Sequence, residues 1–137
     1  MKLCDDAKRL IDGANFAHFS TIQEDGSPKV EPVWLGREGD RVLVTSDANS
    51  LKGKNIERDP RVALSIVAFE NPYEQLLIRG SVVEIRPDDD LAFLDSLAQK
   101  YTSAPFGRRK WRRRAVYVIE PKIARYYQSP LVHNPLV

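Results

Sequence analysis

Two lysines, Lys52 and Lys54, lie between two β-rich runs and are surrounded by Ser, Asn and Gly. This composition predicts the start of a short helix, where backbone N–H groups lack intrahelical acceptors and the positive end of the helix dipole is exposed. The lysines add full positive charges to that environment, which suits a phosphate. Two such lysines alone are more often a solvated surface, so the surrounding elements must decide between the two interpretations.

The remaining residues do not form a reactive centre of a familiar kind. The chain has one cysteine, Cys4, and two histidines, His18 and His133, which are far apart in the sequence. A single cysteine excludes an intrachain disulfide, and these spacings do not match a zinc site. We interpret His18 as a surface or dimer-face residue rather than a catalytic one. No metal site is predicted, catalytic residues stay unassigned, and any chemistry is expected from a bound cofactor.

Length and composition indicate one globular domain over residues 1–137. With 42% hydrophobic and 29% charged residues, the chain can bury a core without a metal or a disulfide. No apolar run approaches the roughly 20 residues that a membrane span needs, and the N-terminus does not resemble a secretory signal. We therefore expect a cytoplasmic protein.

Positive charge is concentrated between positions 108 and 114, which hold six of the chain's 21 lysines and arginines. The net charge is only +2, so the rest of the chain is net negative. Three interpretations of this cluster stay open: a solvated loop, a contact to an acidic ligand, and a nucleic-acid contact in which Trp111 stacks on bases. An acidic ligand is preferred to nucleic acid because the rest of the chain is net negative and carries no nucleic-acid motif.

The sequence around the lysines predicts short strands connected by tight turns. Asp5 or Asp6 is expected to cap a first helix that Gly13 ends. The pair Asp25-Gly26 lies between two β-rich runs and predicts a hairpin. Short connections then predict an antiparallel meander, with strands over 16–22, 28–35 and 41–46.

The second half of the chain continues this pattern. Asp59-Pro60 ends the lysine helix, and Gly80, inside a long strand, predicts a bulge or a barrel bend. The acidic residues 88–90 are expected to cap a helix whose apolar stripe, with Tyr101, belongs to the core. The remaining strands are expected over 61–68, 75–85, 115–119 and 123–127. Six or seven antiparallel strands with two or three peripheral helices predict a mainly β fold, a small β-barrel.

The order and spacing of several motifs resemble one family, the split β-barrel flavin and deazaflavin oxidoreductases. These include pyridoxamine 5′-phosphate oxidase and its relatives that use coenzyme F420. The resemblance runs from about Phe16 to about Tyr101, and 119–121 also fits. It rests on the ordered set Asp25-Gly26-Ser27-Pro28, Pro32-Val33-Trp34, Thr45-Ser46, Lys52-x-Lys54-Asn55, Asp59-Pro60-Arg61, Asn71-Pro72-Tyr73 and Arg79-Gly80.

The resemblance implies a homodimer with two cofactor sites at the subunit interface. Lys52 would hold the cofactor phosphate, helped by strand-end residues and by the helix start. The strand that contains Pro32 would face the tricyclic ring, with Trp34 as a packing residue beside the pocket. A side chain from the partner subunit would reach the ring at the position of Gln75. The implied cofactor-binding residues are Glu31, Pro32, Val33, Thr45, Ser46, Lys52, Lys54, Asn55 and Gln75.

The choice of cofactor depends on a departure from the oxidases at Leu51, where they tend to carry an arginine as a second phosphate ligand. Lys54 is expected to compensate for this loss. Coenzyme F420 carries a phosphate and an oligoglutamate tail, which would suit the basic cluster at 108–114. The leading hypothesis is an F420-dependent oxidoreductase that transfers hydride to a small unsaturated acceptor. An FMN-dependent oxidoreductase and a non-catalytic flavin- or tetrapyrrole-binding protein are the alternatives.

Overall fold

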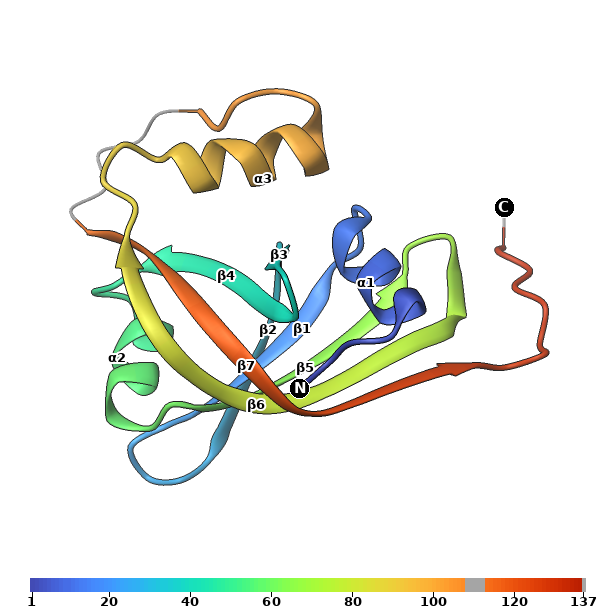
Figure 1. The fold of residues 1–137 in the computed structure, drawn as a ribbon, viewed down its shortest axis with the longest axis horizontal. Coiled ribbons are helices and arrows are strands. Elements are labelled where there is room, and N and C mark those ends of the chain that lie inside the picture. The colour runs from blue at the N-terminus through green and yellow to red at the C-terminus, as the bar shows by residue number, and fades with distance from the viewer. Residues whose placement is uncertain (108–112, 137) are drawn as a thin grey trace.

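The computed structural model describes residues 1–107 and 113–136 and shows a curled antiparallel sheet with helices at its ends (Figure 1). Seven strands pair in the order β2-β1-β5-β6-β7-β4-β3. The outer strands β2 and β3 do not pair with each other, so the barrel stays open. The elements are α1 (Asp5–Asp12), β1 (Ala17–Ile22), β2 (Pro28–Val33), β3 (Gly36–Glu38), β4 (Arg41–Asp47), α2 (Leu51–Arg58), β5 (Arg61–Ala68), β6 (Asn71–Pro87), α3 (Ala92–Thr102) and β7 (Arg114–Gln128).

The predicted mainly β fold is confirmed, and a strongly bent pair of long strands accounts for its curvature. β6 and β7 pair along most of their length, and their register shifts at Arg79/Gly80 and again at Val82/Glu84. A Cβ atom at Gly80 would collide with the backbone carbonyl oxygen of Glu120. The expected bulge at Gly80 is therefore present, and only glycine permits this close approach of the two strands.

The core lies on the concave side of the sheet and is closed by α1. Alternate residues of the strands point inward, as in β1, where Ala17 and Phe19 are buried and His18 is exposed. α1 adds Leu10 and Ile11, which are almost completely buried. Because alternation decides which side chains face outward, it also decides which of them can line a surface site.

The strand connections differ from the predicted meander in one respect. The hairpin of β1 and β2 is confirmed, with Ala17 opposite Val33 and Ile22 opposite Pro28. β4, however, pairs with β7 rather than with β2, so the meander was wrong beyond the hairpin. The chain leaves β2 after Val33 because Leu35 turns into the core, where it is completely buried. The two strands expected at 115–119 and 123–127 form the single strand β7.

The helix caps also depart from the expected residues. The N-cap of α1 is Cys4, whose Sγ accepts a hydrogen bond from the Ala7 N–H at 3.4 Å, rather than Asp5 or Asp6. In α3 the expected acidic cap is present: the Asp88 carboxylate accepts from the N–H groups of Phe93 and Leu94, each at 3.0 Å. This carboxylate fixes the start of α3 beside β4 (Figure 1). None of the helices within the described residues is long and apolar enough to cross a membrane.

Candidate cofactor-binding site

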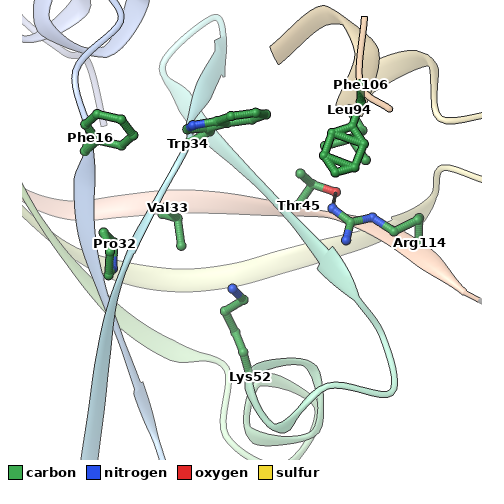
Figure 2. A pocket seen from close by; sticks show the side chains of 9 residues that line it. All are labelled: Phe16, Pro32, Val33, Trp34, Thr45, Lys52, Leu94, Phe106 and Arg114. Carbon is green, nitrogen blue, oxygen red and sulfur yellow. Dashed lines mark hydrogen bonds between the residues drawn. The ribbon is translucent and has the colours of Figure 1, made fainter. Parts of the chain in front are cut away.

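A cleft of about 320 Å³ opens where the end of β2, β4, α2 and α3 come together. Its lining combines two cationic side chains, Lys52 and Arg114, with apolar and aromatic ones; Arg114 lies beside Leu94 and Phe106, and Trp34 lies across from Lys52 (Figure 2). Such a combination suits an organic ligand that has both a flat ring and an anionic group. The cleft is lined by Phe16, Pro32, Val33, Trp34, Thr45, Lys52, Leu94, Phe106 and Arg114.

The first turn of α2 brings Lys52 to the base of this cleft. Ser50 is the N-cap, and its hydroxyl accepts a hydrogen bond from the Gly53 N–H at 3.1 Å. The buried hydroxyl of Ser46 lies 2.9 Å from that of Ser50, so the end of β4 fixes the cap. Only 13% of the Lys52 side chain is exposed, and its amine points into the cleft (Figure 2). The strand end and the cap therefore orient this cation before any ligand binds.

Glu31 is the present counterion of Lys52. Its Oε1 lies 3.2 Å from Nζ of Lys52 and 3.0 Å from Nζ of Lys29. Burial raises the pKa of this carboxyl, but the bonds to Lys29 and Lys52 outweigh it and hold the pKa below its usual value. Glu31 is therefore ionised at neutral pH and neutralises part of the charge that a phosphate would use.

Arg114, the first residue of β7, supplies a second cation to the cleft. Its Nη2 donates a hydrogen bond to Oγ1 of Thr45 at 3.1 Å, and that hydroxyl donates to the carbonyl of Ala115 at 2.9 Å. Burial lowers the pKa of Arg114, and the nearby carboxylates of Asp47 and Asp88 oppose this shift. An arginine stays charged at neutral pH in any case. Lys52 and Arg114 thus bring two positively charged side chains to the same cleft.

The apolar wall is built on Trp34. Its ring stacks on Tyr101, with centroids 5.3 Å apart and planes 6° from parallel, and meets Phe106 edge-on at 6.3 Å. The Tyr101 hydroxyl donates to the carbonyl of Asn15 at 2.6 Å and accepts from the Leu35 N–H at 3.2 Å. The predicted packing role of Trp34 is therefore observed, and its fixed ring forms a flat surface at the edge of the cleft.

Lys100 anchors α3, the helix that carries Leu94 into the cleft. Its Nζ donates to the backbone carbonyls of Ile11 at 2.8 Å and Leu35 at 2.6 Å. Burial lowers the pKa of Lys100 to about 8, and Asp12 opposes the shift. A partly buried amine thus connects α3 to α1 and to the segment after β2.

The structure brings several of the predicted site residues together. Pro32, Val33, Thr45 and Lys52 line one cleft, although they come from β2, β4 and α2. Glu31 reaches the same place through its ion pair with Lys52. Ser46 is buried beneath the helix cap rather than exposed to the cleft. Their roles as cofactor ligands stay predictions, but this grouping gives those predictions a common location.

Lys54 and Asn55, by contrast, point away from the cleft. Lys54 lines a separate hollow that also contains Leu51 and Asp25. Asn55 is completely buried; its Nδ2 donates to Oγ1 of Thr21 at 3.1 Å, and its Oδ1 accepts from Arg58 at 2.8 Å. Asn55 therefore holds α2 against β1, and Lys54 shares the hollow of Leu51 rather than the cleft of Lys52.

Two further predictions concern a second subunit and residues outside the described ranges. Gln75 is exposed on the outer face of β6, opposite Val67 and Tyr127, and its predicted contact requires a second subunit. Residues 108–112 of the basic cluster lie outside the described residues. Across 1–107 and 113–136, no group of three or more His, Cys, Asp or Glu side chains could hold a metal ion.

Four cleft residues were not predicted from the sequence: Phe16, Leu94, Phe106 and Arg114. Arg114 was noticed only as the last member of the basic cluster. Its position in the cleft follows from the β4–β7 register, in which Asp47 pairs with Arg114 and Thr45 with Val116. No local pattern carries that information, because the two strands are far apart in the sequence.

The fold and the cleft agree with what comparisons of sequence and structure show. Residues 3–128 match the family model described as pyridoxamine 5′-phosphate oxidase. No curated protein is detectably similar in sequence to this chain. A solved structure described as an F420 reductase is 29% identical, with a TM-score of 0.80, over 86% of this chain and 94% of that one.

Two more distant structures share the fold. A conserved hypothetical protein from Mycobacterium tuberculosis is 18% identical, with a TM-score of 0.77, over 98% of this chain and 92% of its own. General Stress Protein 26 from Bacillus anthracis str. Sterne is 19% identical, with a TM-score of 0.69, over 90% and 92%. Together with the open seven-stranded barrel, the family match shows that the chain belongs to the flavin-binding pyridoxamine 5′-phosphate oxidase family and has its split-barrel fold.

Proposed function

We propose that the protein is an F420-dependent oxidoreductase that transfers hydride from the reduced deazaflavin to a small unsaturated organic acceptor. The observation that carries this proposal is the cleft that combines two cations, Lys52 and Arg114, with an aromatic wall formed by Trp34. The similarity to a protein described as an F420 reductase favours the deazaflavin over FMN.

The side chains of the cleft fit such a cofactor. A phosphate would lie between Lys52 and Arg114, near the positive end of the α2 dipole. The ring would lie along Pro32 and Val33 and against Trp34. The bound cofactor supplies the hydride chemistry, while these residues bind it, orient it and exclude water. Arg114 takes the part of the second phosphate ligand that Leu51 does not provide.

A homodimer is part of this proposal. Leu77 and Tyr127 are large apolar side chains that are 45% and 56% exposed on the outer face of β6 and β7. They surround Gln75, which pairs with Tyr127 across the ladder. An exposed apolar face of this kind is typical of a protein–protein contact. Sedimentation equilibrium should give twice the monomer mass, and Leu77→Asp should shift the equilibrium toward monomer.

Titration with each cofactor tests the proposed function directly. Purified protein is mixed separately with F420 and FMN, and the dissociation constants are measured by fluorescence. F420 is expected to bind more tightly than FMN. Tight binding of FMN without binding of F420 would overturn this choice of cofactor.

The family match itself favours a second candidate, an FMN-dependent oxidoreductase on the same barrel. A yellow protein with flavin absorbance on purification would support it. A third candidate, a flavin-binding protein without turnover, would be supported by F420 or FMN binding with no reduction of any acceptor in a broad panel.

A further inference from the structure

A glycine follows Lys52 in α2, and the structure leaves no space for a side chain at its position. Gly53 is the third residue of the helix and is buried. A Cβ atom here would lie 2.6 Å from the carbonyl oxygen of Ala48 and 2.8 Å from the hydroxyl of Tyr117. Both separations are shorter than van der Waals contact, so a larger residue would force the first turn of α2 away from the end of β4.

Helix formation alone does not favour this glycine. Among residues other than proline, glycine is the least favourable inside a helix, because it loses the most backbone freedom on folding. Gly53 also lacks the positive φ that Gly26 and Gly39 adopt, so it is not required for an unusual backbone conformation. The close approach to Ala48 is therefore the feature that requires glycine at this position.

Ala48 connects the backbone segments that carry the two cations of the cleft. Its N–H donates a hydrogen bond to the carbonyl of Arg113 at 2.7 Å, directly before Arg114 in the chain. Its own carbonyl lies against Gly53, directly after Lys52. Ala48 therefore lies between the first turn of α2 and the start of β7 and contacts both.

These contacts fix the backbone positions from which the two cations reach the cleft. Lys52 extends from α2 and Arg114 from β7 (Figure 2). The Arg114 guanidinium is also held by Oγ1 of Thr45 at 3.1 Å, on the strand that leads to Ala48. Long side chains can rotate, but the separation of their Cα atoms is set by the backbone. The contact between Gly53 and Ala48 therefore limits how far apart the two charges lie.

We propose that Gly53 is a positioning residue that makes the cleft selective for a cofactor with a phosphate group. By letting the first turn of α2 lie on Ala48, it holds Lys52 at the separation from Arg114 at which both cations contact one phosphate. This inference rests on the proposed function and adds a residue that determines specificity. Charge-assisted hydrogen bonds depend on distance and angle, so a displaced first turn would lose one of the two contacts.

Tyr117 allows the same contact to be changed from the side of β7. Its side chain is almost completely buried, and among the described residues its hydroxyl has no hydrogen-bond partner. Burial of an unpaired hydroxyl is unfavourable, so Tyr117→Phe should leave the protein at least as stable as the wild type. The substitution removes one of the two oxygens that a Cβ atom at Gly53 would meet. Tyr117→Phe should therefore relieve part of the effect of Gly53→Ala.

The test compares each cofactor with a counterpart that lacks the phosphate. FMN is paired with riboflavin, and F420 with the deazaflavin analogue of riboflavin; the dissociation constants are measured by fluorescence. Gly53→Ala should weaken the binding of F420 and FMN about tenfold and change that of the phosphate-free counterparts less than twofold. A purely structural role would lower the affinity for both members of a pair alike.

Gly80→Ala is the matched control, because its Cβ atom would also meet a backbone carbonyl, but at the bulge of β6 and outside the cleft. It should lower the urea midpoint and leave the ratio of the two affinities within twofold of the wild-type ratio. In the double variant Gly53→Ala/Tyr117→Phe, about threefold of the lost affinity should return. Tyr117→Phe alone should change the affinity less than twofold.

The outcomes distinguish this inference from the proposed function. If a cofactor binds and Gly53→Ala leaves the ratio of affinities unchanged, the positioning role is overturned and the proposed function stands. If Gly53→Ala and the double variant both fail to fold, the contact supports the whole fold, and the positioning role is likewise overturned.

If neither cofactor binds the wild type, the proposed function fails, and inorganic phosphate tests the positioning role. Phosphate is titrated into isotope-labelled protein, and the amide NMR signal of Lys52 is followed. This signal should shift and saturate in the wild type and in Gly80→Ala, but not over the same range in Gly53→Ala. Equal responses of the three proteins, or none in any of them, would overturn the positioning role.

Discussion

Replacement of Lys52 tests the phosphate assignment most sharply. A hydrogen bond to a charged partner contributes about 1.5–3 kcal/mol to binding, and its removal loses that amount. A loss of about 1.4 kcal/mol corresponds to a tenfold weaker affinity. Lys52→Ala should therefore weaken cofactor binding about 10- to 100-fold. Fluorescence titrations with F420 and FMN give the dissociation constants. The free energy of unfolding of Lys52→Ala, measured in urea, should differ from that of the wild type by less than about 0.5 kcal/mol, because Glu31 keeps its second partner, Lys29.

The ion pair between Glu31 and Lys52 predicts an effect of opposite sign. A phosphate must replace the carboxylate that lies 3.2 Å from Nζ of Lys52. Exposed ion pairs contribute about 0–1 kcal/mol, and Glu31 is partly exposed. Glu31→Gln should therefore lower the dissociation constant for phosphate-containing ligands by up to about fivefold. In the Lys52→Ala background this gain should disappear, because the two residues act through the same contact.

Lys54 provides the matched control for this experiment. It has the same charge and lies two residues away, but its side chain lines the hollow with Asp25 and Leu51. Lys54→Ala should change the dissociation constants less than twofold. Equal losses from Lys52→Ala and Lys54→Ala, or an unchanged affinity after Lys52→Ala, would refute the assignment of the phosphate to the cleft.

Three further predictions concern Arg114, Gly80 and Lys100. Arg114→Gln should weaken cofactor binding about tenfold or more by loss of a charge-assisted bond, whereas the exposed neighbour Arg113→Gln should change it little, as measured by the same titration. Gly80→Ala should lower the free energy of unfolding in urea by about 1–3 kcal/mol because its Cβ meets the backbone of β7, whereas Gly107→Ala, which meets nothing within 4 Å, should be neutral. The folded-state pKa of Lys100, about 8, lies below the unfolded value of 10.5, so the unfolded chain binds more protons between these values. Lys100 should therefore make the free energy of unfolding rise between pH 8 and pH 10, by at most about 1.4 kcal/mol per pH unit. Urea titrations at several pH values should show that Lys100→Met removes this rise. An identical pH dependence in both proteins would contradict the assignment.

Local patterns were sufficient for the parts of the fold that local chemistry decides. Asp25-Gly26 predicted the β1–β2 hairpin because Gly26 adopts a positive φ, and Gly80 predicted the bulge in β6 because a Cβ atom there would meet the backbone of β7. The pairing of β4 with β7 could not be predicted in the same way. It depends on contacts between strands that are separated by about half of the chain, and alternation alone does not specify the partner of a strand.

The residues of the candidate site show the same difference between local patterns and long-range strand pairing. Lys52 was predicted from the composition of the strand–helix connection, whereas Thr45 was implied by the family resemblance; both line the cleft, and their roles as ligands stay predictions. Lys54 was expected beside Lys52, but helical geometry turns a side chain at i+2 to a different face. Arg114 was missed as a cleft residue, since only the long-range ladder brings it to Thr45.

The anchoring of both cleft cations at the end of β4 has a consequence for sequence variation. Lys52 follows β4 through a short connection, whereas Arg114 is aligned with β4 by strand pairing. Insertions or deletions between Gly107 and Arg113 should therefore leave both cations in place. A one-residue deletion within β7 would instead shift the ladder and turn Arg114 to the opposite face. Relatives with this site should vary in length before β7 and keep a constant spacing within it.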